Sequence, residues 1–323
     1  MTHLPDFVEA LGDGIFAIDT GFHRDRFDAA YLLVQGGRAA FIDTGTNFAV
    51  PRLLSALQSL GIERDAVEWV IPTHVHLDHA GGVGLLLQQL PAARLMVHPA
   101  GARHLIDPSR LWAGATAVYG AEEMARSYGE LLPVAADRVV ESSDGMCMQV
   151  GDRELLLIHT PGHARHHHCL WDAASRGWFT GDTFGLSYRE FDSDRGAWIV
   201  PTTTPVQFDP PALLSSIQRL LAMDPACMYL THFGRVQDVQ RLGALLIDQL
   251  TQLAELGKRL RHAPDRHQAL KDGQLAIFTS SLAEHGCPLH KTLIAELLAI
   301  DLELNAQGMA IWLDRDTART SDT

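Results

Sequence analysis

The chain has 323 residues, which is enough for one large domain with an appendage or for two ordinary domains. Its 26 basic and 39 acidic residues give a formal charge of −13, which argues against a general nucleic-acid surface or an anionic-membrane surface. No stretch approaches the ~20 apolar residues of a membrane span, and residues 1–6 lack the basic and apolar regions of a secretory signal. We therefore expect an unexported protein that binds neither nucleic acid nor membranes.

The first part of the chain alternates strands with helices. Hydrophobic patterning predicts strands at residues 14–20, 30–35 and 38–43, the last two joined through Gly36-Gly37 as a hairpin. A helix is expected over residues 50–60, with leucines at helical spacing and Pro51 in its first turn. Strands at 68–72 and 94–97 follow, and then helices at 100–106 and 121–131.

A second run of strands is predicted at residues 138–141, 146–150, 154–158, 167–171 and 177–180. Residues 182–211 show no clear period. A helix over residues 211–223 leads to a strand at 227–230. Two strand-rich halves flanked by helices indicate a layered α/β sandwich.

The composition changes after residue 234. Leucines at i, i+3 and i+4 spacing fill residues 242–260, and further helices are expected near 265–284 and 289–304, with a polar frayed end from Asp314. We therefore divide the chain into a domain of residues 1–240 and a helical C-terminal extension of residues 241–323. For this extension, substrate binding, packing and a homodimer contact all stay open.

The four cysteines favour a reducing compartment. They lie far apart and form no Cys-x-x-Cys pair, and three of them lie in apolar runs, so buried free thiols are expected in place of disulfides. A cytoplasmic location fits this pattern. The cysteines are Cys147, Cys169, Cys227 and Cys287.

Residues 73–79 read Thr-His-Val-His-Leu-Asp-His and directly follow a predicted buried strand. Alternate residues of a strand share a face, so His74 and His76 can point to one side of the turn. Asp78 and His79 come next, and Gly81-Gly82 let the backbone pass close to them. One segment can therefore hold two ions. Nitrogen ligands with a carboxylate suit zinc, although iron and manganese accept similar sets.

Three further metal-ligating side chains follow predicted strands. His163 comes after the strand at 154–158, Asp182 after the strand at 177–180, and His232 after the strand at 227–230. Strand ends that gather at one edge of a sheet make a binding site. These residues extend the candidate metal centre beyond the first segment.

With these residues the sequence resembles the metallo-β-lactamase-fold superfamily, specifically its hydrolase branch that includes glyoxalase II and the acyl-homoserine lactonases. The resemblance rests on the His-x-His-x-Asp-His motif at residues 74–79, followed in the family's order by His163, Asp182 and His232. It implies a four-layer αβ/βα sandwich, here with a helical C-terminal appendage. The Asp43-Thr44-Gly45 turn is similar to the family's early acidic turn that supports the site.

The resemblance also implies how the ligands divide between two divalent ions. His74, His76 and His163 would bind the first ion. Asp78, His79 and His232 would bind the second, and Asp182 would bridge the two. With these positions filled, we expect the neighbouring histidines at 166–168 to orient a ligand or to pack within a strand.

The irregular segment at 182–211 is our candidate for substrate recognition, because a long irregular segment that begins at a metal ligand is often functional. Its candidate contacts are Phe184, Tyr188 and Trp198, and simple covering of the core is the alternative. The lactonases carry a tyrosine soon after the bridging aspartate. Gly185 stands near that position here, which weakens the case for lactone hydrolysis.

The expected function is dinuclear metal-dependent hydrolysis of a small ester, thioester or lactone. The ions would supply a hydroxide nucleophile at neutral pH, and Asp78 would pass a proton to the leaving group. Three alternatives stay open: a phosphodiesterase of the same fold, a mononuclear-iron dioxygenase, and a metal-bound regulator without turnover. The acidic composition disfavours a nucleic-acid substrate, and the presence of both His79 and His232 favours two ions over one.

Overall fold

The computed structural model describes residues 4–203 and 206–321. The chain forms two compact units. We call the first the sheet unit, because the β-strands lie in it, and the second the helical unit. The domain boundary after residue 240 stays a prediction. The sheet unit comprises Met1–His159, His166–Gly181 and Ala226–Arg235, and the helical unit comprises Thr160–Arg165, Asp182–Pro225 and Val236–Thr323.

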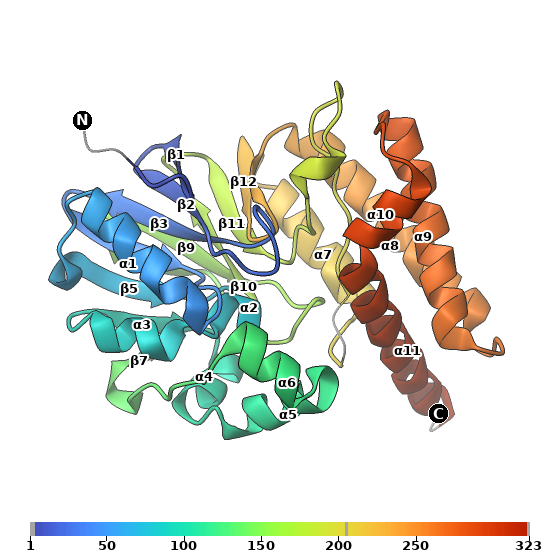
Figure 1. The fold of residues 1–323 in the computed structure, drawn as a ribbon, viewed down its shortest axis with the longest axis horizontal. Coiled ribbons are helices and arrows are strands. Elements are labelled where there is room, and N and C mark those ends of the chain that lie inside the picture. Colours follow the sequence, from blue (N-terminus) through green and yellow to red (C-terminus); the bar gives the residue numbers. More distant parts are fainter. Residues whose placement is uncertain (1–3, 204–205, 322–323) are drawn as a thin grey trace. The chain divides into compact units, whose positions relative to one another are not determined.

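A seven-stranded sheet contains β1 to β7 in sequence order (Figure 1). Strands β1 to β4 pair antiparallel, and β4 to β7 pair parallel. The predicted hairpin is confirmed, since Gly36 and Gly37 form the turn with φ of 58° and 79°. The strands are β1 (Val8–Gly12), β2 (Ile15–Asp19), β3 (Ala29–Gln35), β4 (Arg38–Ile42), β5 (Val67–Ile71), β6 (Arg94–Val97) and β7 (Val139–Glu141).

A six-stranded sheet has the order β13-β12-β11-β10-β9-β8. Strands β8 to β11 pair antiparallel, and β11 pairs parallel with β12. The predicted strands of this half are confirmed, whereas β1 and β13 were not predicted. The strands are β8 (Met146–Val150), β9 (Arg153–His159), β10 (His168–Asp172), β11 (Gly177–Gly181), β12 (Cys227–Leu230) and β13 (Gly234–Val236).

The pleat of β3 separates two hydrophobic layers. Leu32 belongs to a buried cluster that includes Leu53 of α1 (Val50–Ser59). Tyr31 points to the other face, where its ring centroid lies 5.3 Å from that of Phe179 in the second sheet. The sheet unit is therefore layered as helices, sheet and sheet, and the predicted α/β sandwich is confirmed.

Helices cover the outer face of the first sheet, with α1 and α3 side by side on it (Figure 1). The expected helices at 50–60 and 100–106 are confirmed as α1 and α4, whereas α5 was not predicted. The helix expected over 121–131 ends at Tyr128, before Gly129 with φ of 70°. The other elements are η1 (Asn47–Ala49), η2 (Arg64–Ala66), α2 (Leu77–Ala80), α3 (Val83–Gln89), α4 (Pro99–Ile106), α5 (Ser109–Tyr119), α6 (Ala121–Glu123), η3 (Met124–Tyr128) and η4 (Ala136–Arg138).

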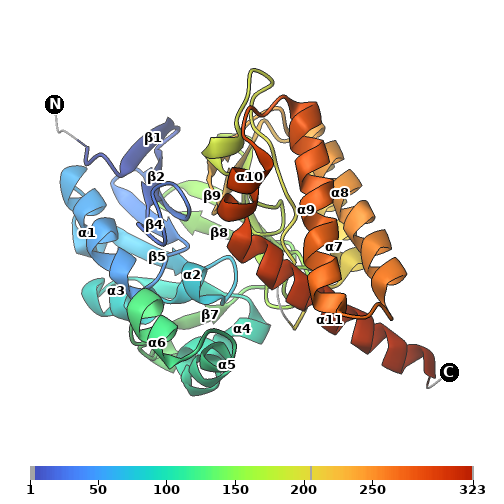
Figure 2. The same cartoon turned by 45° about the vertical axis from the view of Figure 1, so that its right-hand side comes forward.

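The helical unit contains the predicted C-terminal helices. Helices α8, α9 and α11 contact one another (Figure 2), and α7 contacts α8. None of the described helices combines the length and the apolar character that crossing a bilayer requires. The elements are η5 (Arg189–Phe191), α7 (Pro210–Leu221), α8 (Val239–Leu260), α9 (Arg266–His285), α10 (Lys291–Leu297) and α11 (Ala299–Ser321).

The expected frayed end from Asp314 is wrong, because α11 continues to Ser321. Arg266 of α9 donates to both carboxylate oxygens of Asp314, at 2.7 and 2.9 Å. This bidentate pair links α11 to α9 at the position where the frayed end was expected to begin.

Candidate metal centre

A buried carboxylate, Asp43, organises the loops that carry the predicted ligands of the sheet unit. Asp43 follows β4, and its Oδ1 accepts from the backbone N–H of Thr73 at 2.6 Å. Its Oδ2 lies 2.8 Å from Nδ1 of His79 and accepts from Thr231 Oγ1 at 2.8 Å. The predicted supporting role of this acidic turn is confirmed, since one side chain fixes the loops after β5 and β12.

Parallel pairing brings these loops to common edges. Ile42 of β4 pairs with Ile71 of β5, so both strands end level, and the loops that carry Asp43 and His74 begin at the same edge. In the second sheet, Gly181 of β11 pairs with Leu230 of β12, just before His232. Within each sheet, this register brings the loops that follow neighbouring strands to one edge.

Gly82 allows the ligand loop to approach the turn after β4. Its N–H donates to the Gly45 carbonyl at 2.9 Å. A Cβ at this position would lie 2.9 Å from the Thr46 carbonyl oxygen, which is closer than side chains tolerate. The glycine is thus required for packing against the turn after β4, and the predicted close approach of the backbone to the metal ligands stays a prediction.

Asp78, His79 and His232 form one group of possible ligands within the sheet unit. One ligand atom from each lies within 4.8 Å of the others. Asp78 Oδ2 is 3.7 Å from His79 Nε2 and 3.4 Å from His232 Nε2. Both histidines are buried, while the Asp78 side chain is 26% exposed. The group can therefore be reached from solvent on the carboxylate side.

Hydrogen bonds set the tautomers of both histidines in this group. The Nδ1 atom of His79 faces the Asp43 carboxylate, and the Nδ1 atom of His232 lies 2.9 Å from the Phe27 carbonyl oxygen. Because carboxylates and carbonyls only accept, both Nδ1 atoms carry protons, and Nε2 is the nitrogen that each neutral imidazole can offer to a cation. Two imidazole nitrogens and one carboxylate oxygen are a donor set that fits a divalent cation.

Asp28 is a buried carboxyl group near these possible ligands, and the sequence did not indicate it. Its Oδ2 accepts from Thr20 Oγ1 at 2.8 Å. Burial raises the pKa of Asp28 to about 7, while positive charge on His232 and on His79 would lower it. No motif marks Asp28, because its role depends on burial and on neighbours far away in the sequence.

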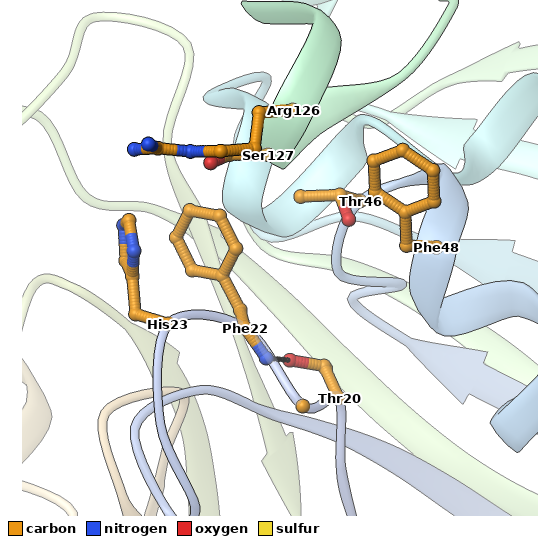
Figure 3. A pocket seen from close by; sticks show the side chains of 8 residues that line it. Thr20, Phe22, His23, Thr46, Phe48, Arg126 and Ser127 are labelled. Atoms are coloured by element: carbon orange, nitrogen blue, oxygen red, sulfur yellow. Dashed lines mark hydrogen bonds between the residues drawn. The ribbon is translucent and has the colours of Figure 1, made fainter. Parts of the chain in front are cut away.

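A pocket of about 340 Å³ lies in the sheet unit (Figure 3). Phe22 and His23 line it, and both rings lie against Phe27, with centroids 6.0 and 5.3 Å away. The Phe27 ring in turn lies 5.4 Å from the His232 ring. Sequence reasoning missed this pocket, since its walls come from three separated segments. The lining residues are Thr20, Gly21, Phe22, His23, Thr46, Phe48, Arg126 and Ser127.

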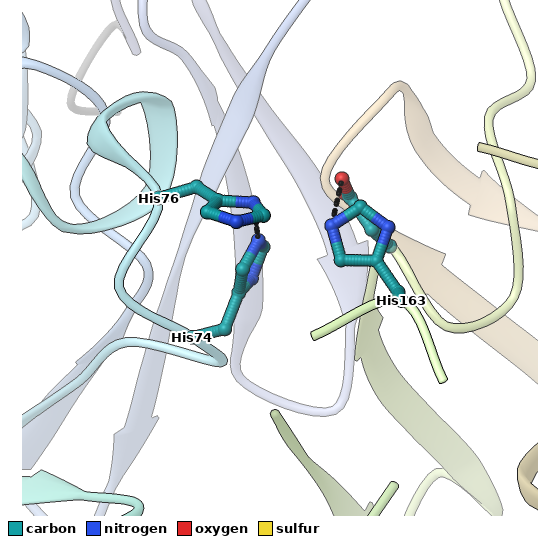
Figure 4. A group of neighbouring side chains, drawn as sticks. His74, His76 and His163 are labelled. Atoms are coloured by element: carbon teal, nitrogen blue, oxygen red, sulfur yellow. Dashed lines mark hydrogen bonds and ion pairs between the residues drawn. The ribbon is translucent and has the colours of Figure 1, made fainter. Parts of the chain in front are cut away.

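His74 and His76 lie side by side after β5, as their alternate positions predicted (Figure 4). His74 Nε2 is 2.6 Å from His76 Nδ1. The His167 ring stacks on His74 at 4.8 Å, and the His166 ring packs edge-on against His76 at 5.5 Å. His166 and His167 thus hold the rings of predicted ligands, in line with the expectation for residues 166–168.

The helical unit holds the other two predicted ligands, and they are neighbours there. His163 Nε2 lies 3.3 Å from Asp182 Oδ2, and both side chains are buried. The loops that carry them are tied together, because Thr183 Oγ1 donates to Thr160 Oγ1 at 3.2 Å. Gly162 has φ of 131°, and a Cβ there would lie 2.2 Å from the Leu213 amide nitrogen. The His163 loop is therefore fitted tightly against the start of α7.

The three candidate substrate contacts are buried in the helical unit. Phe184, Tyr188 and Trp198 are at most 1% exposed. Tyr188 donates to Asp301 Oδ1 at 3.2 Å, and Trp198 Nε1 donates to Ser281 Oγ at 2.9 Å. The aromatic side chains Tyr188 and Trp198 thus anchor the irregular segment to α9 and α11. Their assignment as substrate contacts stays a prediction.

Comparison with known proteins gives a consistent family. The family model described as the metallo-beta-lactamase superfamily matches residues 23–232. The acyl-coenzyme A thioesterase MBLAC2 of Bos taurus is 31% identical over 188 residues, which cover 54% of this chain and 64% of that protein. The chain therefore matches less than two thirds of this relative's length.

Two solved structures share the fold over most of their length. The metallo-beta-lactamase superfamily protein ST1585 from Sulfolobus tokodaii has a TM-score of 0.63 at 20% identity, covering 92% of this chain and 98% of its own. The metallo-beta-lactamase family protein TTHA1429 from Thermus thermophilus has a TM-score of 0.67 at 20% identity, covering 96% of each chain. Because their identity is low, these structures carry information about the fold alone.

Proposed function

Because the chain belongs to the metallo-beta-lactamase superfamily, we propose that it is a metal-dependent hydrolase that cleaves an acyl thioester or a related ester. The observation that carries the proposal is the Asp78, His79 and His232 group, in which both imidazoles present Nε2 to a common point. The name of the bovine relative, an acyl-coenzyme A thioesterase, supports the choice of thioesters among acyl substrates. A lactone is the least favoured acyl substrate, because Gly185 replaces the lactonase tyrosine.

We propose two divalent ions. His74, His76 and His163 would hold one ion, Asp78, His79 and His232 would hold the other, and Asp182 would bridge them. The short contacts within the His74–His76 pair and within the His163–Asp182 pair are compatible with this division. Zinc suits these nitrogen and oxygen donors, and iron or manganese would accept the same set.

When bound, such ions supply a hydroxide nucleophile at neutral pH and stabilise the negative charge that develops on the carbonyl oxygen. Asp43 and the Phe27 carbonyl keep His79 and His232 in the tautomer that presents Nε2. Asp78 is the catalytic residue, since its partly exposed carboxylate can take the nucleophile's proton and pass it to the departing thiol. No serine or cysteine nucleophile is required.

We propose a cytoplasmic location and a small-molecule substrate without nucleic-acid or membrane partners. All four cysteines are free thiols, as predicted. Their expected burial is confirmed for Cys169 and Cys227, whereas Cys147 is exposed and Cys287 is half-buried. Free thiols are typical of a reducing compartment. A homodimer contact through the C-terminal helices stays a prediction.

The first test is elemental analysis of protein purified without added metal. We expect close to two ions per chain, and Asp182→Ala should lose at least one of them. The matched control is Asp152→Ala, because Asp152 is bonded to Gln35 in an exposed position of the sheet unit. One iron per chain, together with oxygen consumption, would contradict the hydrolase proposal and favour the mononuclear-iron dioxygenase.

The second test is turnover on a panel of thioesters, aryl esters, lactones and phosphodiesters. We expect the highest kcat/KM for a thioester, and Asp78→Asn should lower kcat about 10²- to 10⁴-fold. Phosphodiester cleavage alone would favour the phosphodiesterase alternative. A metal-loaded protein that turns over no member of the panel would contradict the proposed function and favour the regulator.

A further inference from the structure

The pocket beside His232 is built by three segments of the sheet unit. Residues 20–23 follow β2, Thr46 and Phe48 lie at the start of η1, and residues 126–127 lie in η3 (Figure 3). Its volume of about 340 Å³ is at the lower end of the ~300–1,000 Å³ found for ligand pockets. It therefore fits one portion of a substrate better than a whole cofactor-sized ligand.

The loop after β2 is held firmly in position. Asp19 Oδ1 accepts from the Gly21 N–H at 2.9 Å, and Asp19 Oδ2 accepts from the Arg26 N–H at 3.1 Å. His23 has φ of 56°, which an L-residue rarely adopts. These contacts keep the Phe22 and His23 rings at the pocket wall and against Phe27.

The pocket wall is one aromatic ring away from the Asp78, His79 and His232 group. One aromatic ring, Phe27, separates the pocket wall from His232, since its centroid lies 5.3 Å from His23 and 5.4 Å from His232. The electrostatics agree with this placement. Burial lowers the pKa of His23, the Asp78 and Glu123 carboxylates raise it, and Arg126 and Arg24 lower it. His23 therefore lies within the fields of both Asp78 and Arg126.

The lining combines a cation with apolar and hydroxyl groups. Arg126 is 71% exposed and pairs with the Glu123 carboxylate. Phe48 is 57% exposed, which is unusual for a phenylalanine, and it presents an apolar surface near Thr46. A guanidinium beside an apolar wall suits an anion carried on a short hydrocarbon stem.

We propose that this pocket binds an anionic portion of the acyl substrate, a carboxylate or phosphate on an apolar stem, with the scissile carbonyl directed to the Asp78, His79 and His232 group. The inference rests on the proposed function, whose substrate class it narrows. Arg126 recognises the charge, Phe22 and Phe48 contact the stem, and Glu123 competes with the substrate for Arg126. Arg126 and Glu123 are thus specificity-determining residues.

The experiment compares three thioesters that differ in where they carry a negative charge. The first has a glutaryl group on N-acetylcysteamine, so the acyl half is anionic. The second has a valeryl group on 3-mercaptopropionate, so the thiol half is anionic. The third, valeryl N-acetylcysteamine, is neutral. If substitution of Arg126 raises KM for the first thioester, the recognised anion lies in the acyl half of the substrate. If it raises KM for the second, the anion lies in the thiol half.

Substitutions of opposite sign test the charge recognition. Arg126→Gln should raise KM about fivefold for one of the anionic thioesters and less than twofold for the neutral one. Glu123→Gln should lower KM for the same anionic thioester, because it releases Arg126 from its partner. The matched control is Arg38→Gln, since Arg38 is 54% exposed and also pairs with a glutamate, Glu68.

Binding measured without turnover separates this inference from the proposed function. The thioether analogues, with CH₂–S in place of CO–S, cannot be hydrolysed, and their dissociation constants can be measured by calorimetry. If no thioester is hydrolysed but Arg126→Gln weakens binding of one anionic thioether, the pocket stands and the hydrolase proposal fails. If thioesters are hydrolysed but Arg126→Gln and Arg38→Gln change KM equally for all three thioesters, the pocket assignment is overturned.

Discussion

The carboxylate of Asp43 lies 2.8 Å from Nδ1 of His79, and both side chains are buried. This contact leaves His79 Nε2 as the atom that faces Asp78 and His232. The same carboxylate accepts from Thr73 and Thr231, so it also positions the two ligand loops.

Asp43→Asn should weaken metal binding about 10- to 100-fold, because the amide no longer fixes the His79 tautomer. Competition with a chromogenic chelator measures the affinity, and thermal unfolding confirms that the variant folds. Asp152→Asn, at an exposed position bonded to Gln35, should bind metal like the wild type. Unchanged affinity in a folded Asp43→Asn protein would show that the contact is only structural.

Metal removal should lower the unfolding temperature of the wild-type protein. An ion present at about 100 times its dissociation constant stabilises the folded state by ~2.7 kcal/mol. His232→Gln should reduce the loss of stability caused by a chelator, because His232 belongs to a ligand group. Substitution of the exposed His262 should leave the chelator effect intact, and calorimetry with and without chelator tests this difference.

Asp28 should make the stability of the metal-free protein pH-dependent. Burial raises its pKa from 3.8 to about 7, so between these values the folded state holds a proton that the unfolded chain releases. The contribution of Asp28 to stability is thus present below pH 4 and is lost as the pH rises to about 7. Relative to Asp28→Asn, the free energy of unfolding should fall over this range by on the order of 4 kcal/mol.

Urea unfolding of metal-free protein at several pH values measures that difference. Asp137→Asn, at an exposed position, serves as the control and should give a flat difference. A flat difference for Asp28→Asn as well would mean that Asp28 is charged in the folded protein at neutral pH.

His168 should make the stability of the protein rise with pH, in contrast to Asp28. Burial lowers its pKa from 6.5 to about 3, and it stays neutral between the Ser142 hydroxyl, at 2.9 Å, and the Pro72 carbonyl, at 3.0 Å. Its stabilising contribution is present above pH 6.5 and is lost as the pH falls toward 3. Between pH 7.5 and 5 the wild type should lose about 2 kcal/mol more than His168→Gln. Equal losses in denaturant titrations of the two proteins would contradict this assignment.

Gly162→Ala should destabilise the protein strongly, because the new methyl group would lie 2.2 Å from the Leu213 nitrogen at a φ of 131°. We expect a loss of at least ~2 kcal/mol. Gly145→Ala is the matched control, since Gly145 also has positive φ but nothing lies within 4 Å of its added Cβ. That variant should lose only about 1 kcal/mol, and similar losses in both would rule out the steric cause.

Local patterns predicted most of the fold. The hairpin at Gly36-Gly37 and the helix α1 follow from turn chemistry and from leucine spacing, both of which act over a few residues. By contrast, β1 is a five-residue strand with two buried positions, which gives almost no alternating pattern. The continuation of α11 past Asp314 was missed, and the contact of Asp314 with Arg266 of α9 is one that no local pattern indicates.

Residue type and spacing are enough to indicate metal ligands, so the sequence alone could indicate Asp78, His79 and His232, which the structure groups together. Asp28 and the pocket at His23 could not be found in that way. Asp28 owes its unusual protonation to burial. The pocket needs Phe22, Phe48 and Arg126 from segments whose meeting is set by tertiary packing.

The position of Asp43 links the two sheets through chemistry as well as through hydrophobic contact. It follows β4 of the first sheet and accepts from Thr231, which follows β12 of the second. A small sliding of one sheet over the other would therefore pull His79 and His232 out of alignment. Substitutions in the hydrophobic layer between the two sheets, away from the proposed ligands, should therefore lower the rate of the proposed hydrolysis before they unfold the protein.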